Sequence, residues 1–353
     1  MRTYSVTEFG GPVVPLELPD PKPVGTEVVV DVSHCGVCHT DIHLQDGYYD
    51  LGDGKRLDLR DRGVTPPVTL GHEVVGTLIA KDPDADIPDD RIGDRFVVYP
   101  WLGCGTCDVC RRDEENLCAS PSSIGVFRAG GYAERCLVPH PKYLVEAPRV
   151  EPALAATYAC SGLTAYSALS KVDIDRERDL LMITGLGGVG YNGVQIARAL
   201  GFQRIAALDI DEGKREVAGR IPGVMVLDPT APETPERLAE AGGVAAAIDF
   251  VGMKATTEFA LAALRKGGLC IVVGLFGGEV AVPLPPLVQR SISLRGSYVG
   301  NLKELRELLV LASEGRIPAL PVEPVAFDRA DDALARLRAG TVHGRLVLSR
   351  DGT

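Results

Sequence analysis

The sequence has few aromatic residues, a single tryptophan and no long apolar run. Crossing a bilayer takes about 20 consecutive apolar residues, so we expect no transmembrane segment and no membrane partner. The opening residues Met1–Tyr4 begin neither a basic nor an apolar region, so a secretory signal is not expected either. The formal net charge is −11 and there is no basic cluster. A nucleic-acid partner would need a positive surface for its phosphates, so nucleic-acid-binding functions are excluded.

The nine cysteines are an odd number, and without a targeting signal they indicate a reducing, cytoplasmic location. With 353 residues the chain is too long for one typical core and fits two domains. Its 40 glycines and 25 prolines suit a loop-rich β domain joined to an α/β domain.

The hydrophobic pattern differs between the two parts of the chain. The first ~150 residues show the alternation and turn signals of β structure. Strands are expected at Glu27–Ser33, Thr69–Ala80, Asp94–Tyr99 and Ala133–Val138. The charged stretch 50–62 has no core-forming pattern and is expected to be an exposed loop.

Later in the chain, near-continuous apolar strands alternate with helical patterns. This alternation predicts a parallel sheet covered by helices on both faces. The expected strands are Leu180–Thr184, Arg204–Asp209, Val224–Leu227, Ala245–Phe250 and Leu269–Gly274, and the expected helices are Val189–Leu200, Glu212–Arg220, Pro235–Ala241 and Thr256–Leu264. Helices at Leu302–Ala312 and Ala330–Ala339 and a strand at Arg345–Leu348 complete the chain.

Four cysteines lie close together with the spacing Cys-x2-Cys-x2-Cys-x7-Cys: Cys104, Cys107, Cys110 and Cys118. Four thiolates within reach of one tetrahedral ion, without a histidine, are typical of a closed structural zinc site. Disulfides would require an oxidising compartment. The ferredoxin pattern of an iron–sulfur cluster has a shorter last gap followed by proline, where this chain has Ala119. The run therefore predicts structural zinc and leaves any catalytic metal to other residues.

The segment Gly185–Gly190 matches G-x-G-x-x-G directly after an apolar strand and opens a helical segment. There the glycines permit a tight turn and close approach of a pyrophosphate, and the helix N-terminus attracts the phosphates. Asp209 follows about 20 residues later, where a carboxylate binds ribose hydroxyls and repels a 2′-phosphate. The pattern predicts NAD rather than NADP, with Lys214 also near the ribose. Alone, the glycines would indicate only a tight turn, and Asp209 only a helix cap.

Ligands for a second metal occur in the segments 35–43 (CGVCHTDIH) and 70–73 (LGHE) and at Cys160. Catalytic zinc keeps three protein ligands and one open position, and two thiolates with one imidazole form a known set. A lone cysteine or histidine more often has a packing role, so none of these residues alone indicates a metal.

Together these segments resemble the zinc-dependent alcohol dehydrogenases of the medium-chain dehydrogenase/reductase superfamily. The resemblance runs from CGVCHTDIH and LGHEVVG through the four-cysteine run, ACSGLTAY and the glycine loop to RGSYVGN at 295–301. It implies an α/β two-domain fold with the active site in the cleft between the domains. Residues 1–155 and 300–353 would form a mostly-β GroES-like catalytic domain with both zinc sites, and residues 156–299 a Rossmann domain with a doubly wound parallel sheet.

The resemblance makes Cys38, His72 and Cys160 the ligands of catalytic zinc, so that NAD and two Zn²⁺ ions per chain are expected. Asp41 matches the carboxylate that holds the zinc-bound histidine, and ligating imidazoles normally donate their other N–H in this way. Glu73 matches an acidic residue behind the metal.

The resemblance also implies which residues contact the cofactor and the substrate. The expected cofactor contacts are Gly185, Gly187, Gly188, Val189 and Gly190, then Asp209 and Lys214 at the ribose, His39 and Arg345 at the pyrophosphate, and Thr164, Val189 and Val273 beside the nicotinamide. Tyr49, Trp101 and Leu275 match the alcohol pocket. Aromatic walls favour an apolar substituent on the alcohol.

The implied activity is that of an oxidoreductase. Zinc would stabilise the alkoxide of a primary or secondary alcohol, which would give a hydride to NAD and leave an aldehyde or ketone, or the reverse. Thr40 is expected to accept the hydroxyl proton and pass it through the ribose hydroxyls to His43, because histidine titrates near neutrality. Without the resemblance, Thr40 would indicate a helix cap and His43 an exposed helical residue.

Three other functions are alternatives to an alcohol dehydrogenase. A polyol or amino-alcohol dehydrogenase of the same superfamily would share zinc and NAD but need a more polar pocket. A zinc-free quinone reductase would lack the metal ligands, and a binding protein that had lost catalysis would not need them.

The expected partners are a small alcohol, aldehyde or ketone and further copies of the chain. The resemblance suggests a homodimer or homotetramer built partly on the sheet edge near Ser291–Gly300. The stretch between Cys38 and His72 is longer than in common members of the family. The additional residues around 51–63 are expected to border the substrate entrance or a subunit contact, or to be a solvated loop. Cys35, Cys136 and Cys270 are expected to be buried packing residues.

Overall fold

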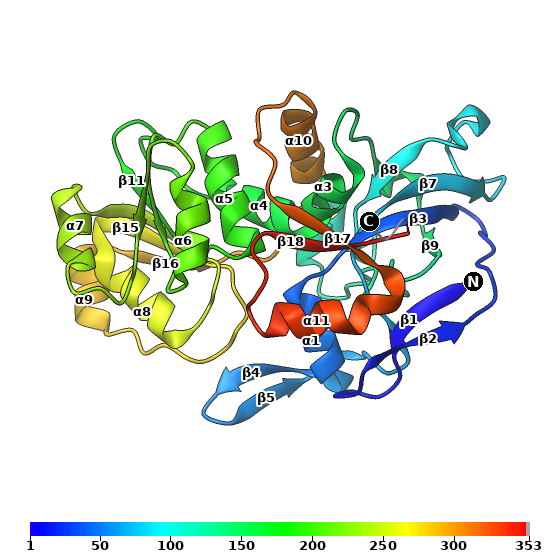
Figure 1. Ribbon diagram of the computed structural model, residues 1–353, viewed down its shortest axis with the longest axis horizontal. Coiled ribbons are helices and arrows are strands. Elements are labelled where there is room, and N and C mark those ends of the chain that lie inside the picture. Colours follow the sequence, from blue (N-terminus) through cyan, green and yellow to red (C-terminus); the bar gives the residue numbers. More distant parts are fainter. Residues whose placement is uncertain (351–353) are drawn as a thin grey trace. The chain divides into compact units, whose positions relative to one another are not determined.

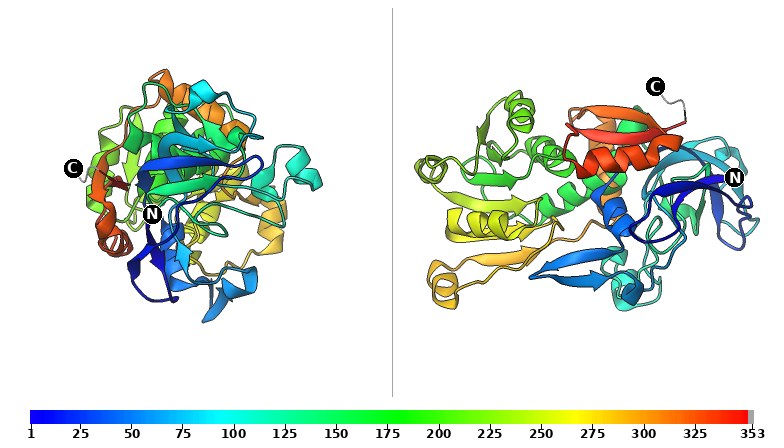
Figure 2. Two further views of the ribbon diagram at one scale, coloured as in Figure 1. Left: turned by 90° about the vertical axis from the view of Figure 1, so that its right-hand side faces the viewer. Right: turned by 60° about the horizontal axis from the view of Figure 1, so that its bottom comes forward.

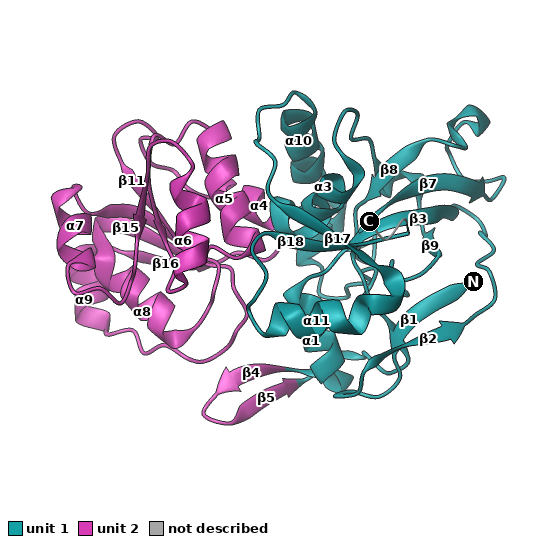
Figure 3. Ribbon diagram, viewed as in Figure 1, with its two compact units in different colours: residues 1–48, 58–163, 300–353 teal, residues 49–57, 164–299 magenta. Residues whose placement is uncertain are grey.

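The computed structural model describes residues 1–350 and divides the chain into two compact units (Figure 3). The first unit comprises Met1–Tyr48, Asp58–Leu163 and Gly300–Thr353, and the second comprises Tyr49–Leu57 and Thr164–Val299. The sequence places the first boundary at 155/156, whereas the structure places it at 163/164. The reason is that helix α3 (Pro152–Thr157) packs against strands of the first unit.

A mostly antiparallel sheet forms the centre of the first unit. Its order is β10 (Leu144–Val145), β8 (Arg95–Val98), β7 (Glu73–Lys81), β3 (Val28–Gly36), β18 (Arg345–Ser349) and β17 (Val322–Ala326), with β9 (Arg135–Val138) also paired to β3. In β3 the alternate residues Val28, Val30 and Val32 are fully buried. Gly36, at the end of β3, pairs with Glu73 of β7 on one side and with Val347 of β18 on the other. This register brings the segments that follow β3 and precede β7 together.

Smaller elements complete this unit. A second sheet has the order β2 (Val13–Glu17), β1 (Arg2–Val6) and β6 (Val68–Thr69). The other helices are α1 (His39–Asp46), α2 (Asp108–Arg111), α10 (Leu302–Ser313) and α11 (Ala330–Arg338), with a π-helical turn at Tyr158–Gly162 and 3₁₀ turns at Arg60–Arg62, Asp89–Arg91, Glu115–Leu117, Pro141–Tyr143 and Phe327–Arg329.

The second unit contains a six-stranded parallel sheet (Figure 1). Its order is β13 (Val224–Leu227), β12 (Arg204–Leu208), β11 (Leu180–Thr184), β14 (Val244–Asp249), β15 (Leu264–Val272) and β16 (Ser293–Gly296). The helices are α4 (Leu163–Ser170), which starts at the last residue of the first unit, α5 (Gly188–Ala199), α6 (Glu212–Gly219), α7 (Thr234–Glu240), α8 (Lys254–Ala263) and α9 (Leu284–Arg290). The strand order reverses between β11 and β14, and right-handed crossovers then place helices on both faces. This confirms the predicted doubly wound Rossmann sheet.

The charged stretch 50–62 is not simply a loop. It forms a hairpin of β4 (Tyr48–Gly52) and β5 (Lys55–Asp58), visible as a two-stranded ribbon in Figure 1 and in the right-hand view of Figure 2. Asp53 and Gly54 both have positive φ, of 50° and 75°, as a two-residue turn between antiparallel strands requires. Within the second unit, the hairpin lies against the loop after β15, since a side chain on Gly277 would lie 2.4 Å from the carbonyl oxygen of Asp50.

Among residues 1–350, no helix combines the length and the apolar character needed to cross a membrane.

Candidate active site

Cys38 lies at the start of helix α1, just after β3, and is the N-cap of that helix. Its backbone N–H donates to Asp41 Oδ2 at 2.9 Å. The Asp41 carboxylate is fully buried and also accepts from the Gly71 N–H at 3.1 Å and from the Tyr132 hydroxyl at 3.3 Å. One carboxylate therefore ties α1 to the segment that precedes β7.

His72 lies in that segment, between β6 and β7. Its neighbour Gly71 has a φ of +93°, and a side chain there would collide with the Tyr132 ring and the Cys35 sulfur. The His72 ring is fully buried, and its Nδ1 lies 3.5 Å from Asp41 Oδ1. With Nδ1 facing a carboxylate, Nε2 is the nitrogen left for a metal.

Cys160 comes from the π-helical turn Tyr158–Gly162, which follows α3. Turns of this type are rare in proteins overall, but those that occur are often at functional sites. Cys160 Sγ lies 3.9 Å from Cys38 Sγ, and the N–H of Ser161 donates to Glu73 at 3.2 Å. The turn therefore joins the ligands that the other two segments supply.

These residues form a compact set that could hold a metal ion. One ligand atom from each of Cys38, His72, Glu73 and Cys160 lies within 4.8 Å of the others, and all four residues are buried. Neighbouring sulfurs in tetrahedral zinc sites are about 3.8 Å apart, close to the 3.9 Å between Cys38 and Cys160. Within residues 1–350, His72 Nε2 has no hydrogen-bond partner, an unfavourable state for a buried imidazole without a metal. The set fits a zinc ion.

The charges in this set support the same reading. Contact with Cys160 lowers the pKa of the Cys38 thiol well below its ordinary value, and His72 adds to this effect. Burial disfavours a charge on His72, but Asp41 and Cys38 together raise its pKa well above the ordinary value. The thiolate form is the one that binds a soft metal.

Glu73 does not stand as a free ligand, because it forms a buried ion pair with Arg345. Arg345 Nη2 donates to Glu73 Oε2 at 2.6 Å and to the Val37 carbonyl at 2.9 Å. Burial raises the pKa of Glu73 to about 7, with Arg345 acting in the opposite direction. Arg345 is only 5% exposed. Sequence analysis singled out both residues but not their pairing, because they are 272 residues apart.

The predicted proton-transfer residues lie on α1. Thr40 Oγ1 is 3.9 Å from Cys38 Sγ. His43 is three residues further on, so that the two side chains share one face of the helix. His43 is half-buried, and burial lowers its pKa below the ordinary 6.5. His39, predicted at the pyrophosphate, is the first residue of the same helix and is half-buried.

Trp101 forms an aromatic wall beside the ligand set. Its ring centroid lies 5.2 Å from that of His72, and its Nε1 donates to the Ala159 carbonyl at 3.1 Å. Tyr49 and Leu275, predicted for the same pocket, belong to the second unit. Leu275 is 46% exposed.

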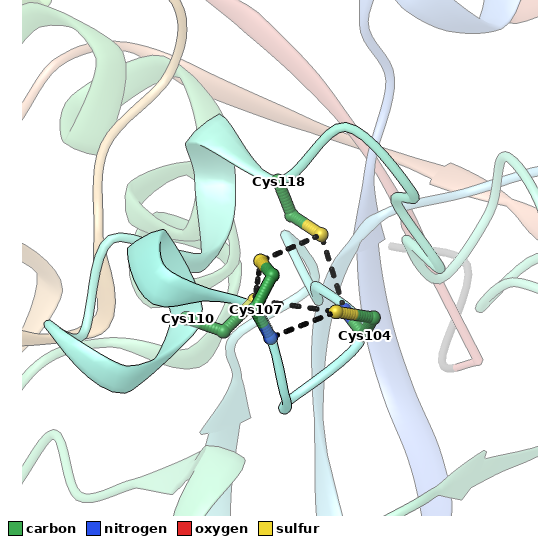
Figure 4. Close-up of side chains that lie close together, drawn as sticks. All are labelled: Cys104, Cys107, Cys110 and Cys118. Atoms are coloured by element: carbon green, nitrogen blue, oxygen red, sulfur yellow. Dashed lines mark hydrogen bonds between the residues drawn. The ribbon is translucent and has the colours of Figure 1, made fainter.

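The four cysteines of the run converge in a separate lobe of the first unit (Figure 4). The Sγ–Sγ distances are 3.4 Å for Cys107–Cys110, 3.7 Å for Cys107–Cys118 and 4.0 Å for Cys104–Cys110. They bracket the spacing of about 3.8 Å in a tetrahedral zinc site. Hydrogen bonding with Thr106 lowers the pKa of Cys104 to about 5, whereas burial raises that of Cys110 to about 12. This lobe fits a closed structural zinc site.

The glycine loop of the second unit connects β11 to α5. Gly185 has a φ of +86°, and a side chain on Gly190 would lie 1.7 Å from the Gly185 carbonyl oxygen. At Gly187 nothing lies within 4 Å of the Cβ position, which leaves room for a pyrophosphate beside the N-terminus of α5. Gly188 and Val189 are the first two residues of that helix.

Asp209 follows β12 and contacts the glycine loop. Its Oδ2 accepts from the Leu186 N–H at 2.6 Å, and its Oδ1 accepts from the Asp211 N–H at 2.9 Å. Both contacts fix the carboxylate beside the glycine loop. Lys214 is half-buried on the first turn of α6.

Arg215 is a neighbour of this position that sequence analysis did not single out. It donates to the Asp209 carbonyl at 2.9 Å and pairs with Asp228 at 3.2 Å. A lone arginine on a helix carries no recognisable sequence signal.

A second loop at the carboxyl end of the sheet is organised by Asp249, which sequence analysis also missed. This fully buried carboxylate accepts hydrogen bonds from the backbone N–H groups of Val251 (2.9 Å) and Gly252 (3.0 Å) and from the hydroxyls of Thr256 and Thr257 (2.8 Å each). The N–H of Val273 donates to the Asp249 carbonyl at 2.9 Å. Thr164, also predicted beside the nicotinamide, is 8% exposed in α4.

Known proteins resemble this chain along its whole length. Residues 25–149 match the family described as alcohol dehydrogenase GroES-like domain, and residues 188–314 match zinc-binding dehydrogenase. An NAD-dependent alcohol dehydrogenase of Saccharolobus solfataricus is 35% identical, covering 99% of each chain.

Two solved structures have the same architecture. The alcohol dehydrogenase of Aeropyrum pernix has a TM-score of 0.89 at 30% identity, with 99% of this chain and 100% of that chain covered. The acetophenone reductase of Geotrichum candidum in complex with NAD has a TM-score of 0.85 at 27% identity, with 99% and 97% covered.

Proposed function

Because the chain belongs to the alcohol dehydrogenases of the medium-chain dehydrogenase/reductase superfamily, we propose that it oxidises primary and secondary alcohols to aldehydes and ketones with NAD, and catalyses the reverse reduction. The observation that carries this proposal is the buried set of Cys38, His72 and Cys160, whose ligand atoms lie within 4.8 Å of one another. Two thiolates and one imidazole leave one coordination position for substrate.

When bound, zinc would act as a Lewis acid on the alcohol hydroxyl and NAD would accept the hydride. The residues of the chain would prepare that reaction. Asp41 orients His72 and the backbone of Cys38, and Trp101 excludes water from one side of the ligand set. Thr40 would accept the hydroxyl proton, and His43, held neutral by its lowered pKa, would be the final acceptor of that proton.

For the cofactor, we propose that the glycine loop binds the pyrophosphate and that Asp209 selects NAD through the ribose hydroxyls. The proposal includes the expected cofactor contacts of five further residues: His39, Lys214, Thr164, Val189 and Val273. Since Arg345 Nη2 is engaged by Glu73 and Val37, a pyrophosphate contact would use its remaining donors.

We also propose a second, structural zinc in the lobe of Cys104, Cys107, Cys110 and Cys118, giving two ions per chain. A cytoplasmic location suits both sites, because metal-binding thiolates need reducing surroundings. For the substrate, the apolar ring of Trp101 would favour an alcohol with an apolar substituent over a polyol.

The test measures initial rates of NADH formation across linear, branched, aromatic and polyol substrates, together with zinc content per chain. We expect turnover of simple alcohols with NAD and two zinc ions. Cys160→Ser should abolish turnover and remove one ion, while the other stays bound. Turnover only with polyols would favour a polyol dehydrogenase of the same superfamily. Failure to bind NAD would contradict the proposal.

A further inference from the structure

The metal lobe and the catalytic ligand set are joined by a short segment of the first unit, Tyr99–Cys104. Trp101, near its middle, is 2% exposed and lies against His72. Its indole N–H is held by the carbonyl of Ala159, the residue before Cys160. Three residues after Trp101 comes Cys104, the first sulfur of the lobe. The wall of the alcohol pocket therefore lies on the same short segment as a ligand of the other metal site.

A buried carboxylate inside the lobe fixes the end of this segment. Glu115, between Cys110 and Cys118, is 5% exposed. Its Oε2 accepts from the Gly103 N–H at 3.2 Å and from the Tyr143 hydroxyl at 2.6 Å, and its Oε1 accepts from Lys142 Nζ at 2.6 Å. Its oxygens are thus committed to the body of the unit rather than to the metal.

Tyr143 carries this connection back to the start of the segment. Its carbonyl accepts from the Tyr99 N–H at 2.9 Å, and the two rings stack with centroids 6.1 Å apart. At the other end, the lobe closes over Gly103, where a side chain would lie 2.5 Å from Cys110 Sγ. Glu115 therefore holds the Gly103 end of the segment directly and is linked to the Tyr99 end through Tyr143.

We propose that Glu115 is a positioning residue through which the metal-loaded lobe holds Trp101 against His72, so that loading of the structural site shapes the alcohol pocket. The inference rests on the proposed function only for the identity of that pocket. The competing view is that the hydrogen bonds from Ser122 to Leu102 (2.8 Å) and from Ile124 to Pro100 (3.0 Å) hold the segment without the lobe.

Trp101 makes the inference measurable without activity, because it is the only tryptophan in the chain. Glu115→Gln keeps the shape of the side chain but weakens its bonds to Lys142 and Gly103. Glu114→Gln is the matched control, since that neighbouring carboxylate pairs with Arg112 at the surface. The readouts are Trp101 emission, its quenching by acrylamide, and the KM values for a secondary alcohol and for NAD, all on the zinc-loaded protein.

We expect Glu115→Gln to shift Trp101 emission to longer wavelength, to raise acrylamide quenching several-fold and to raise the KM for the alcohol about tenfold. The KM for NAD and the properties of Glu114→Gln should stay at their original values. Unchanged emission in a folded Glu115→Gln protein would overturn the proposal. If emission moves while no alcohol is oxidised, the proposed function fails and the positioning role stands.

A second experiment uses the original protein and therefore tests the proposal even if Glu115→Gln does not fold. Zinc is removed stepwise from the original protein with a chelator while Trp101 emission, released zinc and activity are followed together. We expect an emission change with the loss of lobe zinc while the catalytic ion is still bound. A change that follows only the loss of catalytic zinc would show that the lobe does not hold Trp101.

Discussion

In our proposal, the Asp41 side chain organises the metal site without being a ligand. It is fully buried and bonds to the backbone of both ligand-bearing segments, through Cys38 and Gly71, while it faces the His72 ring. A carboxylate in this position fixes the imidazole orientation and increases its basicity.

Asp41→Asn should therefore lower zinc affinity about 10- to 100-fold. The measurement is a competition titration with a chromogenic chelator, followed by the loss of one ion per chain. Asp46→Asn, on the same helix but paired with Arg338, is the control and should leave affinity unchanged. Equal affinities for the two variants would contradict the role assigned to Asp41.

His43 gives a prediction for the pH dependence of turnover. Burial lowers its pKa below 6.5, so the imidazole is neutral and able to accept a proton down to that lowered value. His43→Gln should reduce kcat for alcohol oxidation near pH 6.5 about 100-fold, with a smaller loss at high pH, where solvent takes the proton readily. Zinc content should not change. Parallel pH–rate profiles for the two proteins would remove His43 from the proton path.

Asp209 determines the choice of cofactor in our proposal. Asp209→Gly removes a negative charge that would face the 2′-phosphate of NADP, and like charges in such a position cost several kcal/mol. The ratio of kcat/KM for NAD to that for NADP should fall about 100-fold. Asp211→Asn removes a neighbouring negative charge but keeps a side-chain oxygen that can accept from the Lys214 N–H at the start of α6, and it should keep the original ratio. Undiminished discrimination in Asp209→Gly would mean that another residue reads the ribose.

Sequence alone could identify the residues whose chemistry is distinctive. Several thiols and an imidazole at ligand spacing indicate a metal site, and a glycine loop after a strand, followed at the right distance by Asp209, indicates a dinucleotide site. It could not identify Glu115, Asp249 or the pairing of Glu73 with Arg345. An acidic residue is common in any loop, and its role depends on which distant donor the fold brings to it.

At the scale of elements, the hairpin β4–β5 shows a similar limit. Its Asp53–Gly54 turn is a hairpin signal, but the flanking strands are largely exposed and lack the alternation that marks a buried face. The strands β11, β12 and β14 of the second unit were predictable because their apolar residues are buried, whereas α9 and β16 contain no buried residue and show no such pattern. Leu180–Thr184 and Val224–Leu227 begin and end at the predicted residues.

In the loop between β14 and α8, the side chain of Asp249 alone accepts four hydrogen bonds. Asp249→Ala would leave one buried donor, the Thr257 hydroxyl, and three partly buried donors unpaired. A buried unpaired donor costs roughly 1–3 kcal/mol, so we expect the free energy of unfolding to fall by about 3 kcal/mol. Because Val273 is held by the same loop, NADH binding should also weaken. Urea unfolding and fluorescence titration with NADH measure the two effects. Glu258→Gln, on the exposed face of α8, should change neither, and wild-type behaviour of Asp249→Ala would refute the argument.

At the scale of the whole molecule, the fold class followed from the order of patterns along the chain. Alternating strands and helices allow few topologies once crossovers are right-handed, and the sheet order agrees with that expectation. The sheets of the first unit were less predictable, since β1, β2 and β17 were not anticipated. Antiparallel strands pair across long sequence separations, as β3 does with β18, and no local pattern records such a partner.

The edge of the Rossmann sheet provides a prediction about assembly. β16 is the last strand of the sheet, and no further strand pairs with it among residues 1–350. Leu294 on this strand is 43% exposed, and Leu284 and Val288 of α9 are 69% and 75% exposed. An edge strand with apolar neighbours is a ready surface for pairing with a second copy.

We therefore expect light scattering to give the mass of a dimer or tetramer. Leu294→Lys should shift the protein towards smaller species, because a lysine on an edge strand opposes pairing. Its zinc content should stay the same, since both metal sets lie in the other unit. Val310→Lys, which replaces a 55% exposed valine on α10 of the first unit, controls for the added charge and should keep the original mass. A wild-type protein with the mass of one chain, or equal masses for both variants, would show that copies do not associate through this edge.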